Sequence, residues 1–275
     1  MELQSDFTLR ARGFRAAEAP LFTLCNSLQR LAPYPEEGTH APLAPDCRLN
    51  GRPCADWLFL RISVNGQHLM MDDAAANCDL CLDLRTGLFT RSYALTLADG
   101  VRVTAQFERI LSMERPGIAA QRVTLASDQP ALLSLNLGVD ANLPDAAACP
   151  WTQTACRMAG NTAGLSLRET AGGQEFTHLF TLSAPGPVMG LDIDRRVVFG
   201  LNGLLRPDAP CVLARTALNR PGGGADPAEL AQAPAFEEVL QQNAGHFARF
   251  WQSRGGRLSP AGAAVLFHLH QRGEI

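Results

Sequence analysis

Short runs in which apolar residues occupy every second position constrain this chain more than any other feature. Between Leu58 and Val64 the even-numbered positions are all aliphatic. A period of two is typical of a β-strand with one buried face, because successive side chains point to opposite sides. Asn65-Gly66 follows directly, and this dipeptide predicts a tight hairpin turn. We therefore expect a return strand over residues 68–71 and a sheet built from antiparallel hairpins.

Similar runs cover most of the first 219 residues. Further strands are predicted at 88–97, 101–111, 119–125, 131–139, 165–169, 176–183, 195–199 and 211–217. Asp99-Gly100 provides a second hairpin turn between the first two of these. Turn residues separate the runs and no helical periodicity lies between them, which predicts a mainly β fold, either a sandwich or a barrel. The first 50 residues, where prolines crowd residues 33–45, are expected to be irregular.

The composition changes near residue 219. Residues 220–227 are rich in glycine and proline and predict a loop. Apolar residues then recur at near-helical intervals over 228–252, and Ser259-Pro260 predicts the start of a last helix. We expect this helix to reach the end of the chain without a stop signal, as in a truncated product. The predicted organisation is a β-domain at 1–219 and a helical segment at 220–275.

Composition and charge exclude several classes of function. Hydrophobic residues make up 46% and charged residues 19% of the 275 residues, so a sizeable core can form. The net charge of −3 gives no reason to expect nucleic acid or an anionic membrane as a partner. All 24 basic residues are arginine, which excludes a lysine Schiff base and a P-loop lysine. No secretory signal and no apolar run of ~20 residues is present, so we expect a cytoplasmic protein.

The cysteines and histidines could suggest a metal site. Cys78 and Cys81 have the spacing of zinc ligands, and Cys47 and Cys54 could complete a four-thiolate set. Six residues separate that second pair, which favours buried, reduced thiols in a cytosolic protein. Four histidines, at positions 40, 68, 178 and 246, are isolated in sequence, and the last two are His268 and His270. His268 and His270 are two residues apart, so on a helix they point to different faces and cannot bind one metal together. From the cysteines and histidines together we expect no metal and no cofactor.

Carboxylates and tryptophans are the residues that a sugar enzyme would use. The acidic pairs Glu36-Glu37, Asp72-Asp73 and Glu237-Glu238 are expected to be solvated surface charges, because adjacent residues face opposite sides of a strand. Trp57 and Trp251 are expected in the core. Trp151, in a predicted loop, is the candidate for carbohydrate contact. No catalytic constellation is visible in the chain.

A resemblance to a known family adds to these patterns. Residues 82–91, which include Asp83, Arg85, Gly87 and Arg91, resemble the LD-x-R-x-G-x-x-x-R strand-turn-strand of glycoside hydrolase family 65. Other segments resemble the family in the same order along the chain. These are residues 22–26, 34–38, 56–66 with Trp57, 109–112 with Arg109 and Ser112, 119–123, 246–251 and 266–271.

The resemblance implies a fold and a class of reaction. The family has an N-terminal super-β-sandwich of the galactose-mutarotase-like type, followed by a helical linker to an (α/α)₆ catalytic barrel. In its phosphorylases an acid in that barrel protonates the leaving oxygen while inorganic phosphate, the co-substrate, attacks with inversion. By this resemblance the chain ends before the barrel and holds no catalytic residue. Scaffold roles are expected for Trp57, Asp83, Arg85, Gly87, Arg91, Arg109 and Ser112, with Asp83 paired to Arg85, and Gly87 in a conformation that side chains disfavour.

The leading hypothesis is an N-terminal accessory domain of a glycoside phosphorylase or hydrolase that acts on α-glucosidic disaccharides. Its implied partners are the (α/α)₆ catalytic domain and, in the full enzyme, a disaccharide; a homodimer of the full enzyme stays open. A free-standing carbohydrate-binding module is the alternative, which needs an exposed aromatic platform. A third hypothesis is a mutarotase-like enzyme, which needs a histidine and a glutamate facing one pocket.

Overall fold

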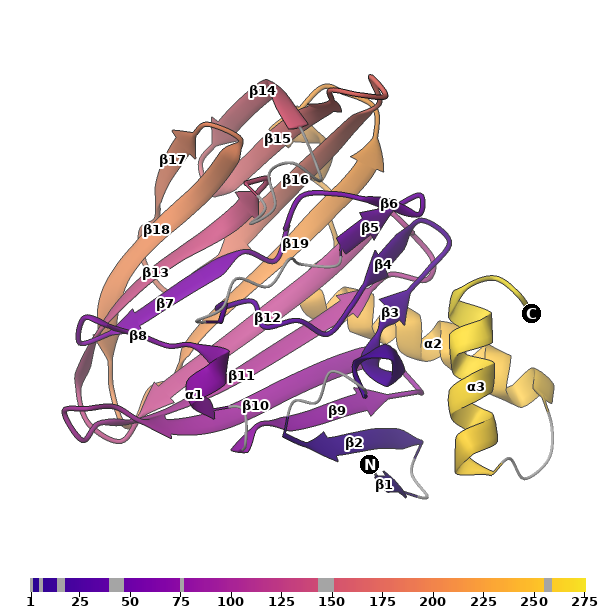
Figure 1. Ribbon diagram of the computed structural model, residues 1–275, viewed down its shortest axis with the longest axis horizontal. Coiled ribbons are helices and arrows are strands. Elements are labelled where there is room, and N and C mark those ends of the chain that lie inside the picture. Colours follow the sequence, from indigo (N-terminus) through magenta and orange to yellow (C-terminus); the bar gives the residue numbers. More distant parts are fainter. Residues whose placement is uncertain are drawn as a thin grey trace.

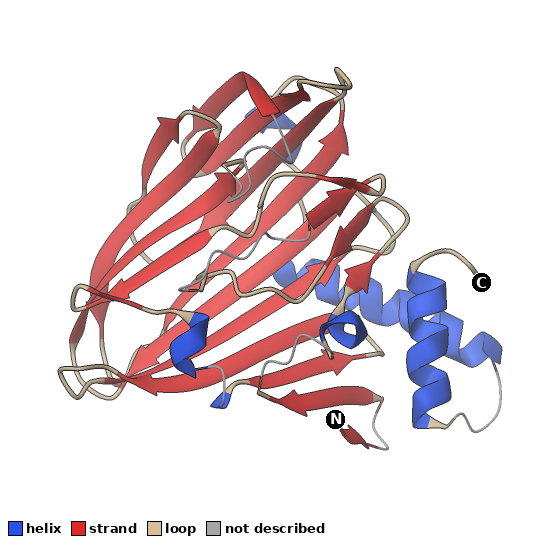
Figure 2. Cartoon of the chain, in the orientation of Figure 1, coloured by secondary structure: helices blue, strands red, loops and turns tan. Residues whose placement is uncertain are grey.

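Two antiparallel β-sheets pack against each other, and a small third sheet and two helices lie at one end (Figures 1 and 2). The computed structural model describes residues 2–4, 7–13, 18–39, 47–74, 77–142, 151–254 and 259–275. The mainly β sandwich with a C-terminal helical segment is confirmed. None of the described helices is long and apolar enough to cross a membrane.

The larger sheet has ten strands within the described residues. They are β1 Glu2–Gln4, β2 Thr8–Arg12, β9 Asp79–Asp83, β10 Leu88–Thr96, β11 Arg102–Leu111, β12 Ile118–Ser127, β14 Trp151–Ala159, β15 Thr162–Glu169, β16 Glu175–Ser183 and β19 Cys211–Pro221. Their order across the sheet is β1-β2-β9-β10-β11-β12-β19-β16-β15-β14. The long central strands pair in hairpins, as the alternation predicts, and β12 pairs with the distant β19.

Two smaller sheets cover parts of this one. The five-stranded sheet contains β7 Leu60–Val64, β8 Gln67–His68, β13 Ala131–Asp140, β17 Met189–Ile193 and β18 Arg196–Leu205, in the order β17-β18-β13-β7-β8. The four-stranded sheet contains β3 Leu24–Cys25, β4 Gln29–Leu31, β5 Cys47–Leu49 and β6 Arg52–Pro53, in sequence order. One large cluster of buried apolar side chains fills the space between the sheets. Short 3-10 turns at Ala19–Phe22 (η1) and Pro227–Leu230 (η3) and the short helix α1 Met71–Ala74 complete the β-domain.

Several strands are not predicted by the sequence pattern. The first 50 residues were expected to be irregular, but they contain β2 to β5 as well as β1. Each of β3 to β6 has only two or three residues, too few for a period of two to be visible. The strands β14 and β17 lie at the edges of their sheets and have few buried positions, so they lack the alternation of a half-buried strand.

The helical segment differs from its predicted bounds. The first long helix, α2, spans Phe236–Arg254 rather than 228–252. Pro234 lies just before it, and a residue that precedes proline is biased away from helical geometry. The second, α3, spans Pro260–Gln271 and begins as predicted, with the Ser259 side chain accepting a hydrogen bond from the Gly262 N–H.

The expectation that the last helix runs out without a stop signal is wrong. Helix α3 ends at Gln271, and Gly273 follows with φ +70°. The Gly273 N–H donates to the His270 carbonyl and the Glu274 N–H donates to the Leu269 carbonyl. This pair of bonds is a Schellman cap, which satisfies the last carbonyl groups of a helix. Gly273 is therefore a stop signal for the helix, and it is visible in the sequence.

Candidate functional site

A row of long polar side chains crosses four neighbouring strands on the inner face of the large sheet. Arg109 of β11 lies directly opposite Gln121 of β12, which in turn lies opposite Arg215 of β19. Arg91 of β10 lies one step away, opposite Phe107. Because opposite residues of paired strands share a face, the pairing register alone brings these four groups together. All four are at most 3% exposed.

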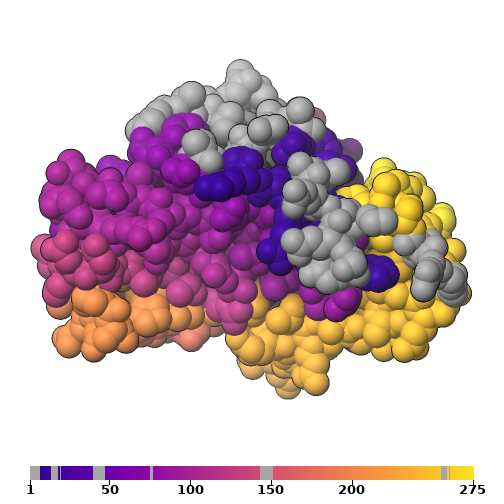
Figure 3. Space-filling view, turned by 90° about the horizontal axis from the view of Figure 1, so that it is seen from below, coloured from indigo at the N-terminus to yellow at the C-terminus, as the bar shows by residue number. Residues whose placement is uncertain are grey.

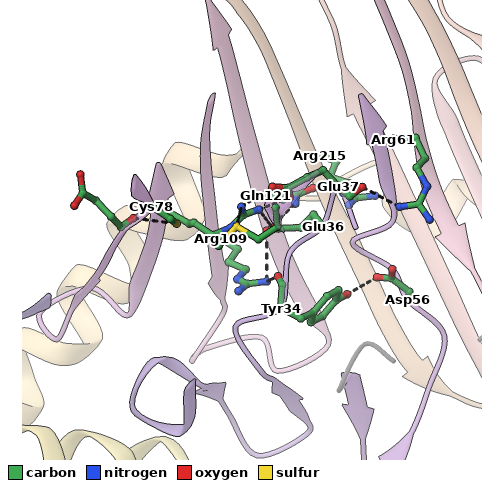
Figure 4. A network of polar contacts seen from close by, with 12 residues as sticks. Tyr34, Glu36, Glu37, Asp56, Arg61, Cys78, Arg109, Gln121 and Arg215 are labelled. Atoms are coloured by element: carbon green, nitrogen blue, oxygen red, sulfur yellow. Dashed lines mark hydrogen bonds and ion pairs between the residues drawn. The ribbon is translucent and has the colours of Figure 1, made fainter. Parts of the chain in front are cut away.

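Residues 32–39 lie over this row and contribute two carboxylates (Figure 4). The Arg91 guanidinium donates to both oxygens of Glu37, with Nη1 2.6 Å from Oε1, and its Nη2 lies 2.5 Å from Oε2 of Glu36. Arg109 Nη1 lies 3.4 Å from Oε1 of Glu36. Arg61 Nη1 also donates to the Glu37 backbone carbonyl at 2.9 Å. Bidentate arginine–carboxylate pairs of this kind are among the strongest hydrogen-bonded contacts in proteins.

This arrangement contradicts the expectation that Glu36 and Glu37 are surface charges. Their exposed fractions are 2% and 0%. The irregular backbone between β4 and β5 lets both adjacent side chains reach the same cation, which an extended strand would not allow. The other two acidic pairs, at residues 72–73 and 237–238, are exposed, as predicted.

Aromatic rings support the two arginines. The Arg91 guanidinium lies 4.1 Å from the centroid of the Phe107 ring, and that of Arg109 lies 4.5 Å from the centroid of Phe89. In both cases the ring belongs to the residue directly opposite on the paired strand. A desolvated guanidinium over an aromatic face is stabilised by the ring quadrupole.

A second polar contact lies beside this row. The Tyr34 hydroxyl donates a short hydrogen bond to Oδ1 of Asp56, and the Leu58 N–H donates to the same oxygen at 2.9 Å. Burial raises the pKa of Asp56 to about 6, although the Tyr34 hydroxyl opposes the shift. The Tyr34 oxygen also lies 3.2 Å from the Cys47 sulfur. This carboxyl therefore titrates near neutrality inside a hydrogen-bonded contact.

The electrostatics decide what the row can do chemically. Burial alone would raise the pKa of Glu36, but the cations Arg109 and Arg91 outweigh it and hold this pKa below its usual value. A general acid for glycosidic cleavage needs the opposite shift. Burial lowers the pKa of Arg215 to about 10, which still leaves it charged at neutral pH. The row is thus a set of fixed, compensated charges that ties residues 32–39 to the sheet.

The structure gives contacts for each predicted scaffold residue. Asp83 does not form an ion pair with Arg85 within the described contacts: its carboxylate accepts from the Arg85 backbone N–H and the Thr86 hydroxyl. The Arg85 guanidinium lies over the Phe7 ring instead. Gly87 has φ +69°, as expected, and an added Cβ would lie 3.1 Å from Phe247 of α2.

Ser112 is fully buried. Its carbonyl accepts from the Asn26 side chain, and its hydroxyl accepts from the Arg115 N–H. Asn26 also donates to Pro116 and accepts from the Leu28 N–H. These bonds hold the start of β4 against the turn after β11. A scaffold role for all these residues stays a prediction, and these contacts are its basis.

The tryptophan predicted to contact carbohydrate is buried. Trp151 is the first residue of β14, only 4% exposed, and packs edge-on against Phe176 of β16. The pairing of β14 with β15 places it in the sandwich rather than in a loop. Trp57 is 2% exposed, in agreement with a core position. In the part of the chain that the structure describes, every aromatic side chain is buried or half-buried.

The thiols and histidines lie mostly apart. Cys47 and Cys54 face each other on the β5–β6 hairpin, and no group of three potential metal ligands occurs among the described residues. His246, which is isolated in sequence, meets His270 in the structure, with their Nε2 atoms 2.8 Å apart. Cys149 and His40 lie outside the described residues.

An open cleft of about 690 Å³ lies between the small sheet and α3. Its lining includes Asn26, Gln29, Arg30, His268 and Arg272. The amides of Asn26 and Gln29 are already bonded to the Pro116 carbonyl. The His268 ring contacts the Leu21 carbonyl. Three of the polar groups that line this cleft therefore have bonds within the fold.

Comparisons with known proteins agree with this architecture. Residues 53–177 match the model of the glycosyl hydrolase family 65 N-terminal domain. The fold is similar to that of a protein described as a putative kojibiose phosphorylase from human microbiome, with a TM-score of 0.79, 17% identity and 91% of this chain covered. The chain spans 39% of the length of that protein. A polysaccharide lyase aligns with a TM-score of 0.31 and 14% identity over 48% of this chain and 22% of the lyase, which is too weak for an argument. A search of curated protein sequences gives no match.

Proposed function

Because residues 53–177 belong to the N-terminal domain of glycosyl hydrolase family 65, we propose that the chain is the accessory β-domain of a glycoside phosphorylase or hydrolase. The enzyme would act on α-glucosidic disaccharides, and its chemistry would be carried by a separate (α/α)₆ catalytic domain. The role of this chain is to provide a rigid platform against which that domain packs. No cofactor is proposed; phosphate is the co-substrate if the enzyme is a phosphorylase.

One observation supports this proposal above the others. The two glutamates at the centre of the sandwich, Glu36 and Glu37, are buried and neutralised by Arg91 and Arg109. A carboxylate held by two arginines is poorly suited to donate a proton, and a fully covered one is out of reach of a disaccharide. The polar centre of the sandwich therefore fits a role in stability rather than in catalysis.

The hypothesis of a free-standing carbohydrate-binding module is less well supported. Sugar-binding sites of that kind use exposed aromatic rings. Trp57 and Trp151, the residues that could provide them, pack in the core, and Trp251 of α2 is half-buried against Phe250 and Phe7. The mutarotase hypothesis meets a similar difficulty, because the fully buried His178 is bonded to Asn219 rather than to a glutamate.

The test is an activity and binding assay on the chain alone. We expect no glucose 1-phosphate when it is incubated with maltose, trehalose or kojibiose and inorganic phosphate. Calorimetric titration with the same sugars should detect no binding with a dissociation constant below about 1 mM. Release of glucose 1-phosphate would refute the accessory role outright. Tight binding without turnover would favour the carbohydrate-binding module instead.

A further inference from the structure

Helices α2 and α3 meet through a stack of rings at one end of the molecule. The two helices form the yellow part of the surface in Figure 3, next to the indigo N-terminal segment. Phe247 of α2 stacks on Phe267 of α3 with centroids 5.0 Å apart. Phe250 stacks on His270 with centroids 3.9 Å apart. Phe247 and Phe267 are fully buried, so these contacts form the apolar part of the junction.

Two histidines face each other at the half-buried rim of this stack. The Nε2 atom of His246 on α2 lies 2.8 Å from the Nε2 atom of His270 on α3, and the ring centroids are 5.0 Å apart. Two imidazoles that share a hydrogen bond have this geometry. One nitrogen must then carry a proton and the other a lone pair. The Nδ1 atom of His270 lies 3.4 Å from the Ile275 carbonyl, which can only accept. This favours the tautomer in which His246 donates and His270 accepts.

From this geometry we propose that His246 and His270 form an acid-sensitive latch between α2 and α3. In the neutral pair, the Nε2–H of one ring donates to the other and holds α3 in place. When only one of the two rings is protonated, the contact between the Nε2 atoms still has one donor and one acceptor. When both rings are protonated, two N–H donors with like charges face each other, and the contact is lost.

The charges around the pair are consistent with this behaviour. Burial lowers the pKa of His246, the neighbouring His270 and Arg249 lower it further, and Glu114 opposes them. Burial also lowers the pKa of His270, with Arg254 adding to the shift and the contact to Ile275 opposing it. The pair is therefore neutral at pH 7 and gains protons only in acid.

The sign of the effect follows from linkage. A histidine whose folded-state pKa is lowered binds fewer protons when α3 is docked than when it is released. Docking is then complete above the ordinary histidine value of about 6.5 and weakens as the pH falls below it. Each histidine that gains a proton on release reduces the docking equilibrium constant by up to about tenfold per pH unit.

Two other side chains anchor α3, and only one of them is independent of pH. Gln271 accepts a hydrogen bond from the Cys25 N–H at 3.2 Å and has no titratable group. His268 Nε2 lies 3.2 Å from the Leu21 carbonyl, so it donates there whether the ring is neutral or charged. Burial nevertheless lowers the pKa of His268, with Arg272 adding to the shift and the Leu21 contact opposing it, so this histidine makes a contribution of its own to the acid effect. The two-histidine contact is thus the anchor at which acid removes a hydrogen bond, whereas His268 keeps its bond to the Leu21 carbonyl when it is protonated.

Hydrogen exchange of the α3 amides in the full chain tests the latch. Exchange is measured at about pH 7.5 and about pH 5 and corrected for the intrinsic effect of pH. We expect the protection of residues 260–271 to fall at least several-fold in acid relative to the central strands of the sheet. In the double variant His246→Gln/His270→Gln this difference should be much smaller, because glutamine does not titrate and His268 is the one anchor named above that still does. The matched control His68→Gln, at an exposed histidine of β8, should behave as the wild type.

A second measurement needs no variant. The ring signals of His246 and His270 are followed by NMR between about pH 4 and pH 8, and we expect coupled titration below the ordinary histidine range. The proposal is wrong if the two rings titrate independently at about 6.5. It is equally wrong if the double variant keeps the wild-type loss of protection in acid.

Discussion

Replacing Arg91 with methionine tests whether the buried charges form one energetic unit. The guanidinium makes hydrogen bonds to both Glu36 and Glu37, and all three side chains are at most 2% exposed. Methionine keeps a long apolar side chain opposite Phe107 but leaves the Glu37 carboxylate without its cation. Removing one partner of a buried pair costs about 3–5 kcal/mol, because an uncompensated charge stays in the interior.

The double variant Arg91→Met/Glu37→Met makes the test specific. It removes the cation together with the carboxylate that depends on it most, while Glu36 keeps Arg109 at 3.4 Å. Apolar replacement of a whole buried pair is often nearly neutral. We therefore expect the double variant to be more stable than either single variant, with a coupling energy of at least about 2 kcal/mol.

The assay is urea unfolding at pH 7, followed by circular dichroism, with the slope of each transition checked against the wild type. Arg168→Met provides the matched control. Its pair with Glu175 is also an arginine–carboxylate contact, at 2.6 Å, but the Arg168 side chain is 57% exposed. That change should cost at most about 1 kcal/mol. If Arg91→Met costs no more than this control, or if the two single effects simply add, the interpretation of the row as a compensated unit is wrong.

Two further changes test other parts of the structure. Asp56→Asn removes a carboxyl whose folded-state pKa is raised to about 6 by burial. A raised pKa stabilises the fold below about pH 4, and that stabilisation is lost as the pH rises through 6, so between pH 4 and 7 the wild type should lose on the order of 2–3 kcal/mol of unfolding free energy relative to the variant. Parallel urea titrations measure this difference, and a difference that stays constant with pH would contradict the pKa shift. Gly87→Ala adds a side chain at φ +69° and 3.1 Å from Phe247, whereas the control Gly100→Ala adds one at φ +86° with nothing within 4 Å. Gly100→Ala should cost about 1 kcal/mol of unfolding free energy from backbone strain alone, and Gly87→Ala should cost measurably more. Equal losses would exclude a contact between this turn and α2.

The strands that could be predicted from sequence are those with one buried face and a local partner. The hairpin turns at Asn65-Gly66 and Asp99-Gly100 were predicted correctly because alternation and turn chemistry are both local. The return strand after Asn65-Gly66 is Gln67–His68 rather than 68–71, because helix α1 begins at Met71. The pairing of β12 with β19 joins residues about ninety positions apart, and no local pattern encodes it. Edge strands such as β17 could not be predicted either, because their side chains are mostly exposed and show no alternation of apolar and polar residues.

One member of the row of buried polar side chains could have been predicted, because it interrupts the alternation of apolar residues in β11. In β11 the inward positions are Val103, Ala105 and Phe107, and the next one is Arg109. An arginine in the apolar phase of a strand predicts a buried charge that needs a partner. Its partner Glu36, and the neighbouring Glu37 that binds Arg91, could not be predicted. Both lie on irregular backbone about 70 residues before Arg109, where adjacency in sequence says nothing about the direction of a side chain.

The contacts of residues 82–91 explain why the segment that resembles the family has this sequence. Asp83 caps the turn through the Arg85 and Thr86 donors, and Gly87 supplies the left-handed backbone beside α2. Arg91 then returns on β10 to bind both glutamates of residues 32–39. One turn and its return strand therefore fasten a helix on one side of the molecule and a covering segment on the other. Packing and charge compensation constrain the residue types at these positions. A motif that resembles one of a sugar enzyme can therefore be explained here without any contact to sugar.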